Sequence, residues 1–141
     1  MAEMKCKQLL KGIADEFERL IDFASSLNKE PLFSKVLAGR DIRAYESGWK
    51  LEAYVEATLL PEEGISAVWW LEVSGPGSHW RIDSFTYFDR LDYHKELESK
   101  VLDSDDQLIH ELQRSVSALI GTYAPGADFR SMIEAVHSGR G

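Results

Sequence analysis

Apolar and polar residues alternate in two stretches near the middle of the chain, and this alternation predicts two β-strands. Residues 49–59 read WKLEAYVEATL and residues 65–73 read ISAVWWLEV, with apolar side chains at the odd positions of both stretches. A period of two places the odd side chains on one face of a strand. The turn at 61–64 joins the two strands, and a loop with an odd number of residues keeps both apolar sets on one face. We therefore expect an antiparallel hairpin with one buried face.

Two further strands are expected to follow this hairpin. The stretch WRIDSFTYF starts at Trp80, and its apolar positions change parity at Phe85, which predicts a bulge near Asp83 and Ser84. Residues 95–102, KELESKVL, fit a strand or a helix by pattern alone. We favour an edge strand, because its lysines would discourage pairing with another sheet edge.

A period near 3.6 marks both ends of the chain as helical. Apolar residues recur every three or four positions over 3–27, and a shorter stretch at 31–38 has an apolar side of its own that ends at Gly39. Ser104 followed by two aspartates is typical of a helix N-terminus, and helical patterns continue from there to residue 137.

Together these patterns predict an α+β protein, folded as a single domain over residues 1–141. We expect helices within residues 3–38, a four-stranded antiparallel meander over 48–102 and helices over 104–137, with the helices packed on the sheet.

Composition and charge narrow the classes of function. The 141 residues suit one domain, and the net charge of −8 argues against nucleic-acid binding, which needs a basic surface. Residues 49–107 hold thirteen acids, five bases and all four tryptophans, whereas acids and bases balance on either side. No apolar run approaches the ~20 residues that span a bilayer, and the start lacks the layout of a secretory signal. We expect a soluble cytoplasmic protein without a disulfide, since Cys6 is the single cysteine.

Few residues suggest catalysis or metal binding. His94, Glu96 and Glu98 would share one side of a strand, but a solvated charged strand explains them more simply than a metal site. Residues 103–106, DSDD, superficially look like the start of a calcium loop, yet the glycine and the final glutamate that such a loop needs are missing. Cys6 lies between two lysines with no evident base nearby. We therefore expect no catalytic residue, no metal and no cofactor, and an enzyme is the less favoured class.

The even positions of the hairpin are harder to explain. Three of them, Glu52, Glu56 and Glu72, are carboxylates that could divide acid and base roles, although a simple acidic surface is the plainer interpretation. The same face contains Tyr54, Val68 and Trp70, and a surface facing only water does not need Val68 and Trp70. Either a terminal helix packs over Trp70, or Tyr54, Trp70 and the three carboxylates bind a partner. Tyrosine and tryptophan anchor interfaces, and surrounding carboxylates steer a basic protein towards them.

Size, acidity and an α+β layout with a tryptophan-rich sheet give the chain a general similarity to two protein families. It resembles the small acidic immunity proteins that neutralise bacterial toxins, and it is also similar to the acidic chaperones of bacterial type III secretion. Either resemblance implies a protein that binds another protein.

Two alternatives remain. A cone like the nuclear-transport-factor-2-like fold would bind or convert a small molecule in a pocket lined by Trp49, Trp69 and Trp80, with Asp83 as a polar group. A structural subunit would use its exposed sheet face to form a homodimer.

Overall fold

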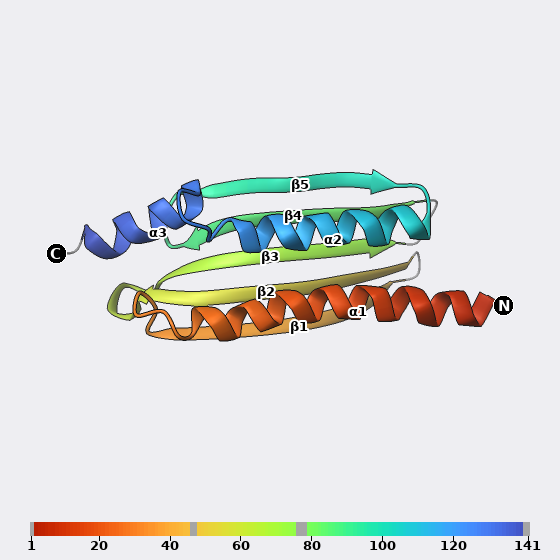
Figure 1. Ribbon diagram of the computed structural model, residues 1–141, viewed down its shortest axis with the longest axis horizontal. Helices are drawn as coiled ribbons and strands as arrows, with labels where there is room; N and C mark the ends of the chain where they lie inside the picture. Colours follow the sequence, from red (N-terminus) through yellow and green to blue (C-terminus); the bar gives the residue numbers. More distant parts are fainter. Residues whose placement is uncertain (1, 46–47, 76–78, 140–141) are drawn as a thin grey trace.

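The computed structural model describes residues 2–45, 48–75 and 79–139 and shows an α+β fold, with a five-stranded antiparallel sheet and three α-helices (Figure 1). The elements follow in the order α1 Ala2–Leu27, β1 Lys35–Tyr45, β2 Gly48–Leu60, a 3-10 turn Pro61–Glu63, β3 Ile65–Gly75, β4 Trp80–Asp89, β5 His94–Leu102, α2 Asp105–Gly121 and α3 Asp128–Ser138. Each strand pairs with the next along the chain, so the sheet order is β1-β2-β3-β4-β5.

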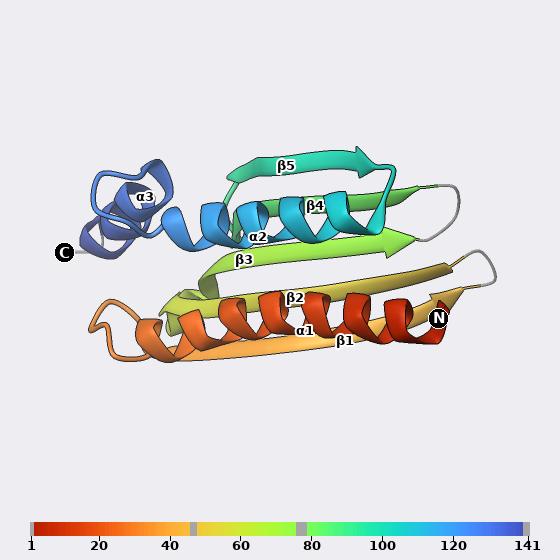
Figure 2. The ribbon, with the colours of Figure 1, turned by 45° about the vertical axis from the view of Figure 1, so that its right-hand side comes forward.

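Helices α1 and α2 lie side by side on the same face of the sheet (Figures 1 and 2). α1 runs along β1 and β2, α2 runs along β3 and β4, and α3 lies near one end of the strands. In the described ranges, no helix is long and apolar enough to cross a membrane. The other face of the sheet, opposite α1 and α2, is called the open face below.

The core lies between the sheet and the two long helices, and Trp69 is its largest fully buried side chain. Its indole meets Phe23 of α1 and Phe129 of α3 edge-on, at ring-centroid distances of 5.4 and 5.1 Å. The indole Nε1 donates a hydrogen bond to Oγ1 of Thr122 at 2.7 Å. Odd positions of β2 and β3 fill this core, which confirms the predicted parity: Leu51, Ala53, Val55, Ala57, Leu59, Ala67, Trp69, Leu71 and Val73.

The predicted short helix at 31–38 is wrong: residues 35–38 begin β1, a strand that the patterns did not predict and that gives the sheet five strands instead of four. Val36 packs against the core, whereas Leu37 beside it is 46% exposed, so the side chains alternate with a strand period. Gly39 does not stop a helix. It lies in the middle of β1 opposite Tyr54 of β2, whose ring covers it.

The predicted change of face within the strand that starts at Trp80, which is β4 in the structure, is also wrong. Ser84 and Thr86 of β4 are buried on the helix side, so Phe85 and Tyr87 keep the open face throughout. A register irregularity does occur at Ser84 and Phe85, where the prediction put a bulge nearby, but the extra residue is Leu97 on β5. Two polar residues inside the core made a regular strand look irregular in sequence.

The remaining elements agree with the patterns. Residues 94–102 form the expected edge strand, and the C-terminal helices lie where the period of 3.6 placed them. Ser104 caps α2 by accepting a hydrogen bond from the backbone N–H of Gln107 at 3.2 Å. Asp105 in the first turn accepts a second bond, from Nε1 of Trp80 at 3.0 Å, which ties the start of α2 to β4.

Candidate functional site

The open face carries side chains from all five strands, and the antiparallel register aligns them in rows across the sheet. One row consists of Gly39, Tyr54, Trp70, Phe85 and Glu96, each the register partner of the next. Because neighbouring strands lie ~4.8 Å apart, side chains in such a row touch. The row therefore forms a continuous aromatic surface across the middle of the face.

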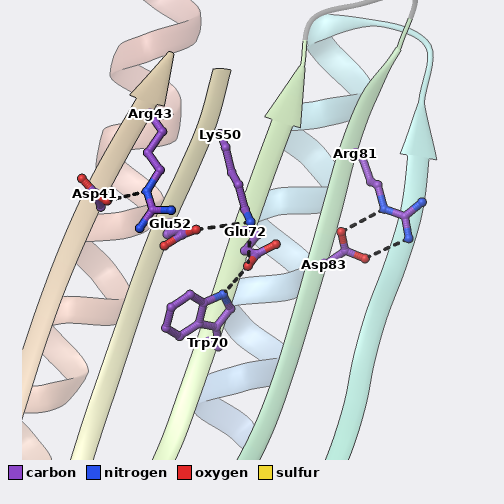
Figure 3. Close-up of polar contacts among 8 residues, drawn as sticks. All are labelled: Asp41, Arg43, Lys50, Glu52, Trp70, Glu72, Arg81 and Asp83. Carbon is purple, nitrogen blue, oxygen red and sulfur yellow. Dashed lines mark hydrogen bonds and ion pairs between the residues drawn. The ribbon is translucent and has the colours of Figure 1, made fainter. Parts of the chain in front are cut away.

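The rings in this aromatic row are nearly parallel. Trp70 lies between Tyr54 and Phe85, with ring-centroid distances of 5.7 and 6.1 Å and an angle of 17° to each. Figure 3 shows the indole of Trp70 lying along the sheet with its broad face towards the viewer. Its Nε1 donates a hydrogen bond to Oε1 of Glu72 at 2.8 Å, which fixes the ring in this orientation.

Two more rings widen the aromatic surface towards β5. Tyr87 and His94 are register partners, and the His94 ring lies 4.9 Å from Phe85 and 6.3 Å from Tyr87 between centroids. Val68 lies between Tyr87 and Glu56 in the register and is only 3% exposed, although it points to the open face. The large side chains around Val68 therefore exclude water from the sheet surface without help from a helix.

A row of carboxylates lies next to the aromatic row, towards the N-terminal end of β2 (Figure 3). Glu52 and Glu72 are register partners on adjacent strands, and Nζ of Lys50 lies 3.4 Å from Oε1 of Glu52 and 3.5 Å from Oε1 of Glu72. The charge of Glu72, followed by contacts with Glu52, raises the pKa of Lys50 above its usual value despite some burial. This lysine therefore bridges two carboxylates that would otherwise repel each other.

The outer carboxylates of this row have their own cations. Asp41 of β1 pairs with Nε of Arg43 at 3.1 Å. Asp83 of β4 accepts from Nε of Arg81 at 2.9 Å and from the hydroxyl of Ser99 at 2.8 Å. The four carboxylates of the acidic row thus pair with three cations, Arg43, Lys50 and Arg81, which lie one step closer to the strand ends.

Carboxylates on the other side of the aromatic row are not matched in this way. Among the described residues, Glu56 and Asp89 on that side have no ion-pair partner, and neither has Glu96 at the β5 end of the aromatic row. Burial is the main cause that raises the pKa of Tyr87 above its usual value, and the charges of Asp89 and Glu56 raise it further. The aromatic surface near Tyr87 therefore lies in a negative potential.

The structure brings the five residues of the partner-binding hypothesis together on the open face: Glu52, Tyr54, Glu56, Trp70 and Glu72. None of the described elements packs over Trp70, so the alternative in which a terminal helix covers it is wrong. Glu52 and Glu72 are engaged by Lys50, which leaves Glu56 as the unpaired carboxylate of the set. The sequence patterns missed Phe85, Tyr87 and His94, and a strict alternation from Ile82 onward was the signal that would have found the first two.

The residues of the pocket hypothesis are not brought together. Trp69 and Trp80 are buried on the helix side, at 0% and 5% exposure, and both indole N–H groups bond to the helical half of the structure. Trp49 is half-buried at the start of β2, and Asp83 points to the opposite, open face. These four side chains therefore do not line a common cavity.

In the parts of the chain that the structure describes, no group of three or more His, Cys, Asp or Glu residues could hold a metal ion. His79 lies beside Asp103, with 3.0 Å between Nδ1 and Oδ1, and His94 belongs to the aromatic surface. The side chain of Cys6 lies outside the described residues.

Comparison with known proteins adds no relative: the chain matches no protein-family model and no curated protein.

Proposed function

We propose that this protein binds a protein partner through the open face, and that the partner presents a basic segment to it. The observation that carries the proposal is the position of Trp70, held between Tyr54 and Phe85 on a sheet face that no described element covers. Extended aromatic surfaces on folded proteins mark interaction sites, and tryptophan and tyrosine are the residues that most often anchor them.

Charge on the open face favours a basic partner over a second copy of the same chain. Three cations, Lys50, Arg43 and Arg81, pair with the carboxylates near the strand ends, whereas Glu56 and Glu96 flank the aromatic surface without an ion pair among the described residues. The protein as a whole carries a net charge of −8. Two such faces would repel each other, whereas a basic segment would be attracted at long range and would then pair with the free carboxylates.

The aromatic rings and the carboxylates of the open face should contribute to binding in different ways, because they differ in burial. Trp70, Phe85 and Tyr87 are half-buried and already ordered by their neighbours, so binding costs little side-chain entropy. The aromatic rings supply the contact area, and the surrounding carboxylates supply orientation and a faster approach. Replacement of a ring should therefore change the dissociation rate, and replacement of a carboxylate should mainly change the association rate.

The test is quantitative binding with the isolated partner. Proteins from native cells that the wild-type chain retains are identified, purified and measured against wild-type and variant chains by calorimetry. We expect Trp70→Ala to weaken binding at least about tenfold, and the wild-type affinity to fall as salt rises. Met132→Ala, on a 36% exposed position of α3, is the matched control and should leave the affinity unchanged.

Three results would contradict the proposal. They are a partner whose affinity is the same for Trp70→Ala as for wild type, a loss of affinity equally large in Met132→Ala, and a binding segment without basic residues.

A further inference from the structure

A shallow depression of about 300 Å³ lies on the open face over the β5 half of the aromatic surface. It is lined by Trp70, Glu72, Phe85, Tyr87 and His94. Four of these five residues have rings and the fifth is a carboxylate. The depression is therefore a small site with a defined chemistry within the larger face.

The rings make a nearly flat floor. Trp70 and Phe85 lie 17° apart, and His94 is tilted by 31° from Phe85 and by 23° from Tyr87. Since the indole of Trp70 lies along the sheet, as Figure 3 shows, the small angle means that the Phe85 ring lies along the sheet as well. Broad π-faces carry negative charge density, so this floor attracts a cation placed over it.

Carboxylates surround the floor. Glu72 lines the depression itself, with Oε1 occupied by Trp70 and Lys50. Glu96 is the register partner of Phe85. Glu56 is the register partner of Val68, which lies between Glu56 and Tyr87 in the sheet. Neither carboxylate has an ion-pair partner among the described residues. An anion would meet repulsion here, and a neutral ligand would leave these charges unused.

We infer that this depression is the binding site for an arginine side chain of the partner. This inference rests on the function proposed above. A planar guanidinium can lie flat on the rings of Trp70 and Phe85 and still point its N–H groups sideways. In that position its fork can pair with a carboxylate at the rim, such as Glu96 or Glu56. A lysine ammonium is compact and strongly hydrated, so it gains less from a flat floor.

The test uses acetylated, amidated Gly-Ser-Xaa-Ser-Gly peptides with arginine, lysine or citrulline at Xaa. Citrulline keeps the planar shape of arginine and removes its charge. Binding is followed by the NMR shift of the Trp70 indole N–H, assigned from its loss in Trp70→Phe. We expect a saturable shift with the arginine peptide, and affinity about tenfold weaker with citrulline and several-fold weaker with lysine.

Variants locate the effect. Phe85→Ala and the double variant Glu56→Gln/Glu96→Gln should each weaken arginine binding at least several-fold. The double variant Asp15→Asn/Asp22→Asn, which removes two exposed carboxylates from α1 on the other side of the sheet, is the charge-matched control and should bind as wild type does.

The outcomes separate this inference from the proposed function. If the partner needs Trp70 but the arginine and citrulline peptides bind equally well, or if no shift saturates, the arginine site is overturned and the proposed function stands. If the arginine peptide binds as expected but partner affinity is the same in Trp70→Ala as in wild type, the proposed function fails and with it the assignment of the site to that partner.

Discussion

The ring of Tyr54 lies across Gly39 on the neighbouring strand, so closely that a Cβ on Gly39 would stand 2.7 Å from the Tyr54 hydroxyl oxygen. The absence of a side chain at this edge-strand position is what allows the ring to lean over β1. Because Tyr54 also contacts Trp70, the glycine supports one end of the aromatic row.

Gly39→Ala should therefore destabilise the protein, although glycine is normally the poorer residue within a strand. The methyl group would push the Tyr54 ring away and cost about 1 kcal/mol in the free energy of unfolding, measured by urea denaturation. In a Tyr54→Ala background the same change should be neutral or slightly stabilising, which makes the pair a double-mutant cycle. Equal effects in both backgrounds would show that the ring contact is unimportant.

The adjacent tryptophans of β3 should respond very differently to truncation. Trp69→Ala removes a fully buried ring and should cost about 3–5 kcal/mol, enough to unfold a marginal domain. Trp70→Ala removes a half-buried ring from the open face and should cost about 1 kcal/mol. Thermal unfolding followed by circular dichroism measures both, and similar losses would contradict the assignment of the two indoles to opposite faces.

Lys50 should stabilise the sheet through the two carboxylates that it bridges. In Lys50→Met, Glu52 and Glu72 would face each other across β2 and β3 without a cation, at a cost of about 1 kcal/mol in urea denaturation. Adding Glu52→Gln to that variant should restore most of the loss, because one of the two like charges disappears. If the second substitution destabilises further, repulsion is not the cause.

Acid should selectively remove the contribution of Glu111, a buried carboxylate of α2. A hydrogen bond from Lys100 at 3.1 Å, assisted by Arg114, holds the pKa of Glu111 below its ordinary value of 4.5, although burial opposes the shift. A lowered pKa means that the stabilisation is present above pH 4.5 and is lost as the pH falls through the folded-state pKa.

The check is the difference in melting temperature between wild type and Glu111→Gln across pH 7 to 2. It should be largest near neutrality and shrink in acid. A difference that does not change with pH would assign the effect to packing alone.

Parity was the most informative signal in the sequence. It placed the core side chains of β2 and β3, and it singled out Tyr54 and Trp70 as residues that needed another explanation. It failed in β4, since Ser84 and Thr86 are polar yet buried, and Phe85 then appeared to be part of the core. One of the three rings of the aromatic row was hidden for that reason.

Two features lay beyond any local pattern. The stretch 31–38 has too few apolar positions to distinguish periods of 2 and 3.6, so pairing with β2 decided that its second half, from Lys35, is a strand. An amphipathic helix also does not reveal which face of a sheet it covers. The path of the chain after β5 brings α2 to the same face as α1, and this leaves Trp70 uncovered.

The meander has a consequence for the order in which the molecule assembles. Every strand pair joins neighbours in sequence, so each hairpin closes a short loop at low entropic cost. The two long helices, in contrast, meet through residues almost a hundred positions apart, such as Gly12 and Ile109, where a Cβ on the glycine would lie 2.7 Å from Cδ1 of the isoleucine. During synthesis α1 leaves the ribosome before α2, and the two helices cannot pack together until the five strands between them have been made. α1 can pack on β1 and β2 soon after they follow it, so we expect the side of α1 that faces α2 to stay exposed longest on a growing chain.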